Sequence, residues 1–272
     1  MRFCFNPMAQ LVGDRHFFTL LIDRFNGILA RLCPATRIVL ILPLLLVSLI
    51  LAPAAPAMAQ SATLSPRQVV EYALTLEKLE ADFYRRAVAA TKGGSLSQVP
   101  QIAKTVLVSY GQDEAQHVTD LSAVLGSLGG NPVEIVIPAN PNYRAILGRD
   151  PFANPVDLLL AGQYVEDLGV AAYKGQVQNL LAAGEAGKTV LAAALEIHSV
   201  EARHAAGIRY LRQTLLKLSV RPWIRNPQEV IYNENRGDSP IPFSSEAFDG
   251  YATREEVLAL VGPILTAAQP SM

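Results

Sequence analysis

Two short stretches of this sequence decide its fold: Asp113-Glu114-Ala115-Gln116-His117 and Val200-Glu201-Ala202-Arg203-His204. Each contains a Glu-x-x-His unit, and in an α-helix this spacing places the carboxylate and the imidazole on one face. Only three histidines follow residue 59, and two of them belong to these units. The repeat therefore predicts two helices that present the same pair of potential metal ligands.

A second unit is also repeated along the chain. Tyr84 follows Glu77 by seven residues, and Tyr173 follows Glu166 by the same interval. Seven residues are close to two helical turns, so each pair lies on nearly one stripe of its helix. The two glutamates precede the Glu-x-x-His units of their own halves by 37 and 35 residues. The chain is therefore interpreted as a duplication of one helical hairpin, offset by 89 and 87 residues.

Apolar periodicity and helix-terminus signals predict the order of the elements. Ser65-Pro66 with Gln68, and Asn154-Pro155, are typical helix starts, and Gly93-Gly94 is a typical stop. Thr253, with Glu256 three residues later, opens a short helix at 254–265. The four long helices are expected at residues 65–92, 99–128, 154–184 and from soon after 184 to 218, with a proline-rich connection at 129–153. We predict an all-α fold: a four-helix bundle of two duplicated helical hairpins with a long crossover, plus a short C-terminal helix.

The first 59 residues differ from the rest of the chain. Residues 38–51 (IVLILPLLLVSLIL) carry no charge, follow three separated arginines, and precede the small-x-small sequence Ala57-Met58-Ala59. This order is typical of a secretory signal peptide and predicts export to the periplasm or the extracellular space, with a mature chain starting near Gln60. The alternative is an uncleaved membrane anchor, since residues 38–59 are long enough to span a bilayer. The bundle is then assigned to residues 60–218, and an irregular tail with the short helix to 219–272.

Removal of residues 1–59 changes the chemistry that the chain can perform. The remaining 213 residues carry 18 basic and 22 acidic side chains, a net charge of −4, and no cysteine, because Cys4 and Cys33 are lost. Disulfides, thiol nucleophiles, iron–sulfur clusters and cysteine-type zinc sites are thereby excluded. The chain has few charged residues and a small net charge, which argues against a nucleic-acid partner bound through its phosphates.

The duplicated hairpins are expected to bring four carboxylates and two imidazoles to one point in the bundle core. Such a set suits two divalent ions, because a glutamate can bridge both ions or bind only one of them. One imidazole can then supply a nitrogen ligand to each ion. The predicted metal ligands are Glu77, Glu114, His117, Glu166, Glu201 and His204. The donor types do not separate iron from manganese, because both metals accept mixed oxygen and nitrogen ligands.

Several further residues have two interpretations each. Tyr84 and Tyr173 are candidate catalytic redox residues or core aromatics, and Glu80 is a helix-surface residue or an extra ligand, because it follows Glu77 by three. Asp113 and Asp120 either orient an imidazole or lie on a solvated face.

Three more positions are open in the same way. Gly111 and Gly169 either allow helices to approach closely or leave space beside the site. His198 is structural or exposed.

The segments ALTLEKLEADFY (73–84), DEAQHV (113–118) and IHSVEARHAAGIR (197–209) carry a family resemblance, as does AFDGYATREEVLALVGPIL (247–265) more weakly. The sequence resembles the ferritin-like di-iron carboxylate superfamily, and more narrowly its exported desiccation-related and stress-associated members. The resemblance implies two bound iron ions, with two manganese ions as the alternative. It also implies a dinuclear-metal oxidoreductase acting on dioxygen or peroxide, for iron oxidation, peroxide removal or catalase-like dismutation. The alternative is a non-catalytic envelope stress protein with a structural or sequestering metal site.

The expected partners follow from these interpretations. They are metal ions or a small oxidant and, in a homo-oligomer, further copies of the chain. A membrane is expected only through an uncleaved N-terminal segment.

Overall fold

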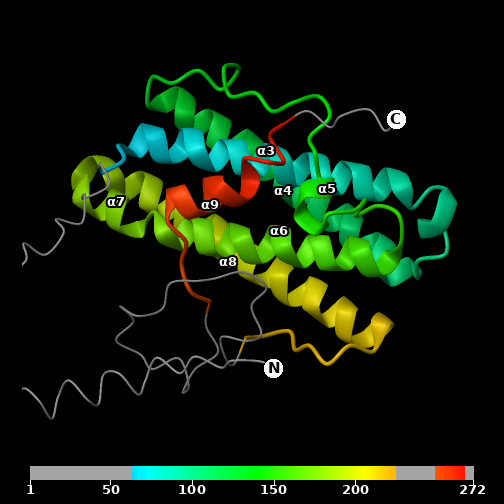
Figure 1. Cartoon of the computed structure of the whole chain (residues 1–272). Coiled ribbons are helices and arrows are strands. Elements are labelled where there is room, and N and C mark those ends of the chain that lie inside the picture. The colour runs from blue at the N-terminus through cyan, green and yellow to red at the C-terminus, as the bar shows by residue number, and fades with distance from the viewer. Residues whose placement is uncertain (1–62, 225–248, 267–272) are drawn as a thin grey trace, which may run out of the picture. The chain divides into compact units, whose positions relative to one another are not determined.

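The computed structural model describes residues 63–224 and 249–266 (Figure 1). Within these ranges every regular element is a helix, which confirms the predicted all-α class. None of the helices in the described part combines the length and apolar composition needed to cross a membrane. The predicted signal peptide or anchor at 1–59 lies outside the described residues, as do residues 225–248 and 267–272 of the predicted tail.

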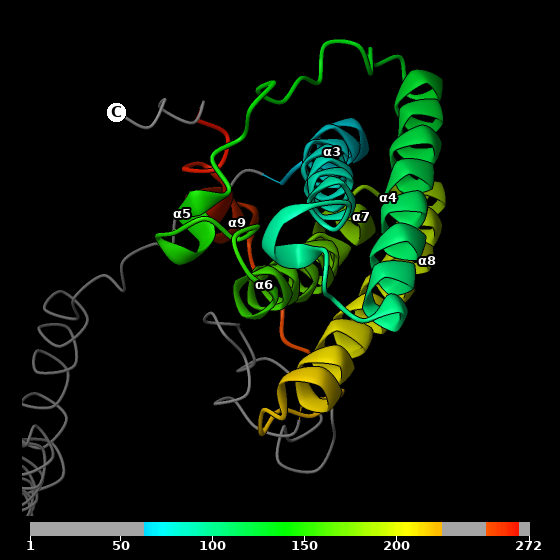
Figure 2. The same cartoon turned by 90° about the vertical axis from the view of Figure 1, so that its right-hand side faces the viewer.

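Four long helices form the bundle, and they pair as the duplication predicts. They are α3 (Pro66–Ala90), α4 (Gln101–Ser127), α6 (Pro155–Gly175) and α8 (Glu185–Leu216). Helix α3 packs most extensively against α4, and α6 against α8, while contacts of α3 with α6 and of α4 with α8 join the two hairpins (Figures 1 and 2). The first hairpin turns through a short 3-10 helix, η1 (Gly94–Leu96), and the second through α7 (Val177–Ala182).

Polar caps open three of the helices where the sequence predicts them. The Ser65 hydroxyl and the Gln68 side chain form a capping box at the start of α3. Thr253 and Glu256 form the same motif at α9 (Arg254–Val261). The Asn154 side chain accepts a hydrogen bond from the backbone N–H of Asp157 at the start of α6. Each cap satisfies an amide that has no partner within its helix, so local sequence alone determines these ends.

Two of the predicted helix ranges are wrong. The helix expected at 154–184 is interrupted after Gly175, where the backbone of residue Ala252 crosses it: a Cβ on Gly175 would lie 1.9 Å from the Ala252 carbonyl oxygen. A contact with a segment so distant in sequence leaves no local signal. Helix α9 ends at Val261 rather than at 265, because Pro263 disfavours helical backbone at the residue before it and has no amide hydrogen to donate.

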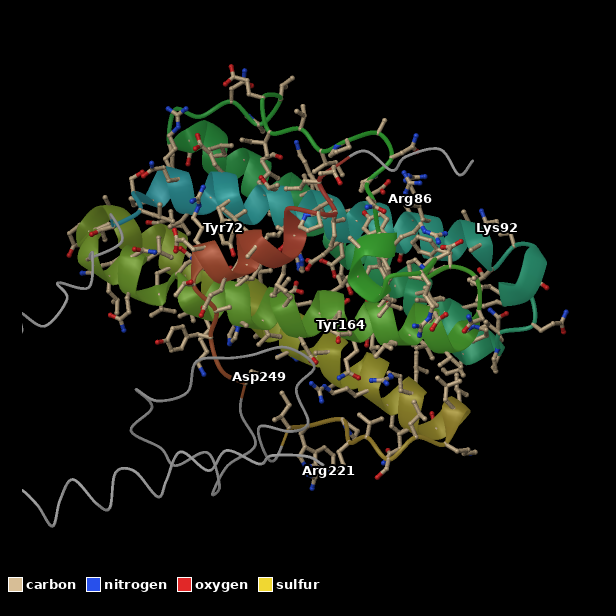
Figure 3. All side chains as sticks on the ribbon, in the orientation of Figure 1. Tyr72, Arg86, Lys92, Tyr164, Arg221 and Asp249 are labelled. Atoms are coloured by element: carbon tan, nitrogen blue, oxygen red, sulfur yellow. The ribbon has the colours of Figure 1, made fainter. Side chains whose placement is uncertain are left out.

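The long connection between the hairpins runs along α3 and is anchored to it by basic side chains. The Lys78 ammonium donates to the Pro132 carbonyl oxygen at 3.0 Å. The guanidinium of Arg86, which is labelled in Figure 3, donates to the Ala139 carbonyl oxygen at 2.8 Å. The connection includes the short helix α5 (Arg144–Leu147) and leads to α6. It is therefore an ordered part of the bundle surface.

Two hydrophobic clusters form the core of the bundle. One contains Phe83, Leu107, Leu158 and Ile208, and the other contains Val70, Leu125, Leu180 and Val190. On α4 and α8 the predicted metal ligands fall between the positions that enter the two clusters, whereas on α3 and α6 members of the first cluster flank the ligand on both sides. The predicted ligands thus form a polar layer within the apolar packing.

A buried ion pair links α6 to α8 next to that layer. The Arg209 guanidinium donates to both carboxylate oxygens of Asp167, with an Nε–Oδ1 distance of 3.2 Å, and both side chains are at most 1% exposed. The Gln163 amide also donates to Asp167, at 3.2 Å. Asp167 directly follows Glu166, so the pair helps to set the rotation of α6 about its axis.

Removing one partner of this pair should be costly, because the other group would stay buried and lose the opposite charge beside it. We expect Arg209→Met to lower the free energy of unfolding by about 3–5 kcal/mol, and Asp167→Leu/Arg209→Met to recover most of that loss. Urea unfolding followed by circular dichroism measures both values. Lys188→Met, which breaks an exposed pair on α8 with Glu185, is the control and should have little effect. Equal losses in Arg209→Met and Lys188→Met would contradict this account.

Candidate metal centre

The six predicted metal ligands lie together in the polar layer of the bundle. Glu77 comes from α3, Glu114 and His117 from α4, Glu166 from α6, and Glu201 and His204 from α8. None of the six residues is more than 7% exposed. Helical spacing puts the ligands of one helix on one face, and hairpin packing turns all four faces inward. Their role as metal ligands remains a prediction.

The first group of ligand atoms surrounds His117. Its Nδ1 lies 3.2 Å from Glu77 Oε2, 3.0 Å from Glu114 Oε2 and 3.4 Å from Glu201 Oε1. All four residues offer atoms within 4.8 Å of one another. This is the arrangement of one imidazole and three carboxylates that a divalent ion with mixed oxygen and nitrogen ligands requires.

The second group surrounds His204 and shares two members with the first. His204 Nδ1 lies 2.8 Å from Glu114 Oε1 and 3.5 Å from Glu166 Oε2, and Glu201 again lies within the 4.8 Å limit. Glu114 and Glu201 therefore belong to both groups, while Glu77 and Glu166 belong to one each. Two ions held here would have Glu114 and Glu201 as bridging carboxylates and the other two as terminal ligands.

Many polar atoms of this layer have no hydrogen-bond partner among the described residues. They are Glu80 Oε2, Glu114 Oε1, Glu166 Oε2, both carboxylate oxygens of Glu201, and His204 Nδ1. His204 Nδ1 approaches Glu114 Oε1 closely, yet the contact lacks the geometry of a hydrogen bond. Buried polar atoms are rarely left without a partner, so these six atoms fit ligands that face a cation. The residues present therefore suit a dinuclear metal site.

Burial changes the ionisation of the carboxylates. It raises the pKa of Glu77 to about 7 and the pKa values of Glu80 and Glu201 well above their usual range, and neighbouring carboxylates contribute in the same direction. The pKa of Glu166 is also raised by burial. In the metal-free protein these groups therefore tend to keep their protons.

The imidazoles behave in the opposite way from ordinary buried histidines. Burial acts to lower their pKa values, but contacts with the carboxylates outweigh it and raise the pKa of His117 to about 12 and that of His204 to about 11. Burial likewise acts to raise the pKa of Glu114, but the two imidazoles lower it to about 2. Protons on the imidazoles thus provide the positive charge that metal ions would otherwise supply.

Hydrogen bonds from outside the ligand set hold the terminal carboxylates. The Tyr84 hydroxyl donates to Glu166, and the Tyr173 hydroxyl donates to Glu77. The two tyrosines are related by the duplication, and so are the glutamates that they contact. Both tyrosines are buried core aromatics that also touch predicted ligands, so the two interpretations of them do not exclude each other.

The structure separates the two aspartates that were candidates for orienting an imidazole. Asp113 Oδ2 lies 3.1 Å from His204 Nε2, on the side of the ring away from the carboxylates, where it favours presentation of Nδ1 to the site. Asp120 accepts a hydrogen bond from Gln116 on the exposed face of α4 instead. His198 is half-buried, and its Nδ1 lies 3.2 Å from the Val170 carbonyl oxygen, which indicates a structural role.

Glu80 is not a helix-surface residue, and that interpretation is wrong. Its side chain is 7% exposed and faces the ligand layer. Gly169 leaves the space for it, because a Cβ at this position would lie 3.2 Å from Glu80 Oε1 and 2.8 Å from Glu201 Oε2. Gly111 instead allows α4 to approach α3 closely, since a Cβ at this position would lie 3.0 Å from the Cβ of Tyr84.

One aromatic neighbour of the site was missed in the sequence. The ring of Tyr110 stacks on His204 with a centroid separation of 3.8 Å. Gly207 makes this possible, because a Cβ there would lie 1.8 Å from the Tyr110 hydroxyl oxygen. The spacing of four residues between Tyr110 and Glu114 was the available signal, since it places both on one face of α4.

Fold and site together define a class: a four-helix bundle with a buried carboxylate–histidine cluster built from one glutamate on each of two helices and Glu-x-x-His on each of the other two. Residues 65–214, more than half of the chain, match the family model described as the ferritin-like domain. The chain belongs to the ferritin-like domain family. No curated protein and no solved structure matches it significantly.

The protonation pattern predicts opposite pH dependences for the metal-free and metal-loaded protein. Without metal, the raised pKa values mean that the native state binds more protons than the unfolded state between pH 4.5 and about 7 for Glu77, and from pH 6.5 up to about 11 for the histidines. Its stability should therefore fall as the pH rises from 5 to 8. With Mn(II) bound, protons compete with the metal, so stability should fall as the pH is lowered over the same range.

Thermal unfolding at several pH values, in chelator and in excess Mn(II), measures both slopes. Parallel slopes in the two conditions would contradict a metal site at these residues.

Glu201→Gln tests the bridging position with little change in volume. We expect the wild-type protein to bind two Mn(II) ions per chain and the variant to bind no more than one tightly. In chelator the variant should melt at or above the wild-type temperature, because a neutral amide replaces a carboxyl group whose ionisation burial opposes. Isothermal titration and thermal unfolding give the two readouts. Glu196→Gln, on the exposed face of the same helix, is the control, and binding of two ions by Glu201→Gln would refute the bridging assignment.

Proposed function

We propose that this protein holds two iron ions in the cluster of α3, α4, α6 and α8 and uses them to reduce dioxygen or hydrogen peroxide, with manganese as the alternative metal. The observation that carries this proposal is that two four-residue ligand groups share two carboxylates within 4.8 Å. Such sharing would suit two cations held side by side, which a single-ion structural site does not need. Two redox-active ions so placed supply the two electrons that convert hydrogen peroxide and two protons into two water molecules.

The protein's own residues provide the conditions for this chemistry. The apolar clusters on either side keep bulk water away from the ligands, and the carboxylates supply the negative charge that favours a higher oxidation state. Tyr84 and Tyr173 are proposed to hold the terminal glutamates and to donate a proton or an electron from their hydroxyl groups. Each touches a predicted ligand directly.

The second candidate function is binding without turnover, as an envelope stress or desiccation-associated protein with a structural or sequestering metal site. It is favoured by the same unpartnered atoms, because cations there would stabilise the bundle whether or not they react. The two candidates differ in a single measurable property, the consumption of oxidant.

Residues 1–59 are proposed to direct export, which would place the bundle in the periplasm or outside the cell and limit its partners to metal ions and small oxidants. Membrane anchoring through residues 38–59 and homo-oligomer formation stay as alternatives to a free monomer. The intact mass of protein recovered from its own compartment tests the cleavage near Gln60.

The redox proposal predicts oxidant consumption that depends on the cluster. Protein loaded anaerobically with two Fe(II) per chain should consume hydrogen peroxide or dioxygen at least tenfold faster than the same Fe(II) in buffer. Glu201→Gln should lose this enhancement, whereas Glu196→Gln should keep it. Oxygen-electrode and stopped-flow absorbance measurements follow the reaction.

The tyrosines are tested in the same assay. Tyr84→Phe should still bind two ions and yet oxidise them more slowly, because the ring is kept and only the hydroxyl is lost. Two bound ions that consume neither oxidant in the wild-type protein would favour the sequestering function.

A further inference from the structure

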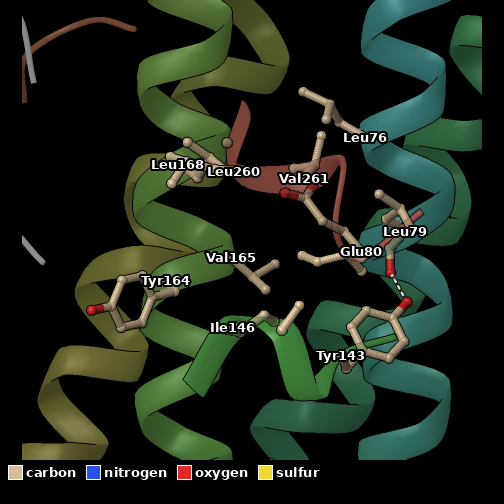
Figure 4. A pocket seen from close by; sticks show the side chains of 13 residues that line it. Leu76, Leu79, Glu80, Tyr143, Ile146, Tyr164, Val165, Leu168, Leu260 and Val261 are labelled. Carbon is tan, nitrogen blue, oxygen red and sulfur yellow. Dashed lines mark hydrogen bonds between the residues drawn. The ribbon is translucent and has the colours of Figure 1, made fainter. Parts of the chain in front are cut away.

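A cavity of about 120 Å³ lies between α3 and α6, on one side of the metal layer (Figure 4). Its wall is almost wholly apolar, and the two long helices contribute Leu76, Leu79, Val165 and Leu168. Of its few polar groups, the Tyr143 hydroxyl already donates to the Leu79 carbonyl oxygen at 2.7 Å. An interior of this kind suits an uncharged, apolar occupant.

The outer wall of the cavity is made by elements that are additional to the four-helix bundle. Ile146 of α5 and Val261 of α9 line it, so the crossover and the C-terminal segment together cover the gap between α3 and α6. Backbone hydrogen bonds hold this cover in place: Asn142 N–H donates to the Ile264 carbonyl oxygen at 2.8 Å. The cavity therefore exists because two segments distant in sequence meet over the bundle.

The inner wall of the cavity borders the candidate metal centre. Glu80 and Gly169 both line the cavity, and Gly169 is also the residue whose missing side chain leaves room for the Glu201 carboxylate. Glu80 is buried, and its Oε2 has no hydrogen-bond partner among the described residues. One glycine therefore separates the apolar space from a predicted bridging ligand.

Comparison of the two duplicated halves shows that the space left by Gly169 occurs on one side of the metal centre. Glu80 and Gly169 are 89 residues apart, the same offset that relates Glu77 to Glu166 and Tyr84 to Tyr173. The two halves thus share their predicted ligands but differ at this position, with a carboxyl group in one and no side chain in the other. The difference breaks the symmetry of the centre where the cavity reaches it.

We propose that the cavity binds a small, uncharged, apolar molecule and holds it next to the metal centre across Glu80 and Gly169. Dry apolar cavities of about 150 Å³ bind benzene or xenon, so a single ring or a short alkyl chain is the size class that fits. The almost wholly apolar wall disfavours anions, because a charged group would lose its hydration there without gaining a partner. Binding itself is independent of the proposed redox function, but the use of the bound molecule as a substrate or a reductant rests on it.

Benzene is a suitable probe, and the metal-free protein in chelator is the first sample. Titration calorimetry should show saturable binding with a dissociation constant on the order of 1 mM, as a six-atom ligand permits. Benzoate, of similar shape but negatively charged, should not bind. Leu168→Phe, which fills the cavity, should weaken benzene binding at least tenfold.

Leu191→Phe is the matched control, because Leu191 is also a half-buried leucine on a long helix but packs in the other hydrophobic cluster. It should bind benzene within twofold of the wild-type protein. If Leu168→Phe does not fold, Val165→Phe replaces it. Failure of the wild-type protein to bind benzene, or equal binding by the cavity-filling variant, would overturn the proposal.

Position next to the metals is tested by nuclear magnetic resonance relaxation of the benzene protons. Mn(II) in the cluster should accelerate this relaxation in the wild-type protein and not in Leu168→Phe, and diamagnetic Zn(II) should have no such effect. Benzene that binds without any Mn(II)-dependent relaxation would refute the placement beside the centre. A protein that binds no Mn(II) would contradict the proposed function, while the titration in chelator would still decide whether the cavity binds its ligand.

Discussion

The burial of five carboxyl groups in one layer of the bundle is the constraint on which the rest of this structure depends. Five glutamates occupy one layer of the bundle, and the ion pairs shown for them involve only the imidazoles of His117 and His204. Without metal the layer holds protons, because separate ionisation of so many buried groups is unfavourable. The two hydrophobic clusters around the layer supply the burial that offsets this cost. The apolar packing that buries these carboxyl groups is therefore also the reason that the layer favours metal ions.

Groups around the ligands then determine how the layer is presented. The tyrosine hydroxyls hold the terminal glutamates, Asp113 orients one imidazole, and the Arg209–Asp167 pair fixes α6 against α8 directly beside Glu166. Each contact links two different helices. Small rotations of any one helix would break them, so the geometry of the site is tied to the packing of the whole bundle.

Duplication explains the near-symmetry of the centre, and its exceptions explain why the two sides differ. The six predicted ligands repeat between the halves, whereas Glu80 faces Gly169 and only one side is covered by α5 and α9. A symmetric hairpin pair would present two equivalent faces to the metals. The additional segments convert one of these faces into an apolar cavity, so the two sides of the centre can hold different molecules.

The sequence by itself determined the helical class, the hairpin duplication, the capped starts of α3, α6 and α9, and the set of side chains that meet in the core. These features depend on spacing within one helix and on hydrogen bonds between residues three apart, which are local. Only the tertiary structure decided the break after Gly175, the burial of Glu80, the stacking of Tyr110 on His204 and the cavity under α5 and α9. Each of these depends on contacts between segments distant in the chain, and helical periodicity gives no information about which neighbour a given face will meet.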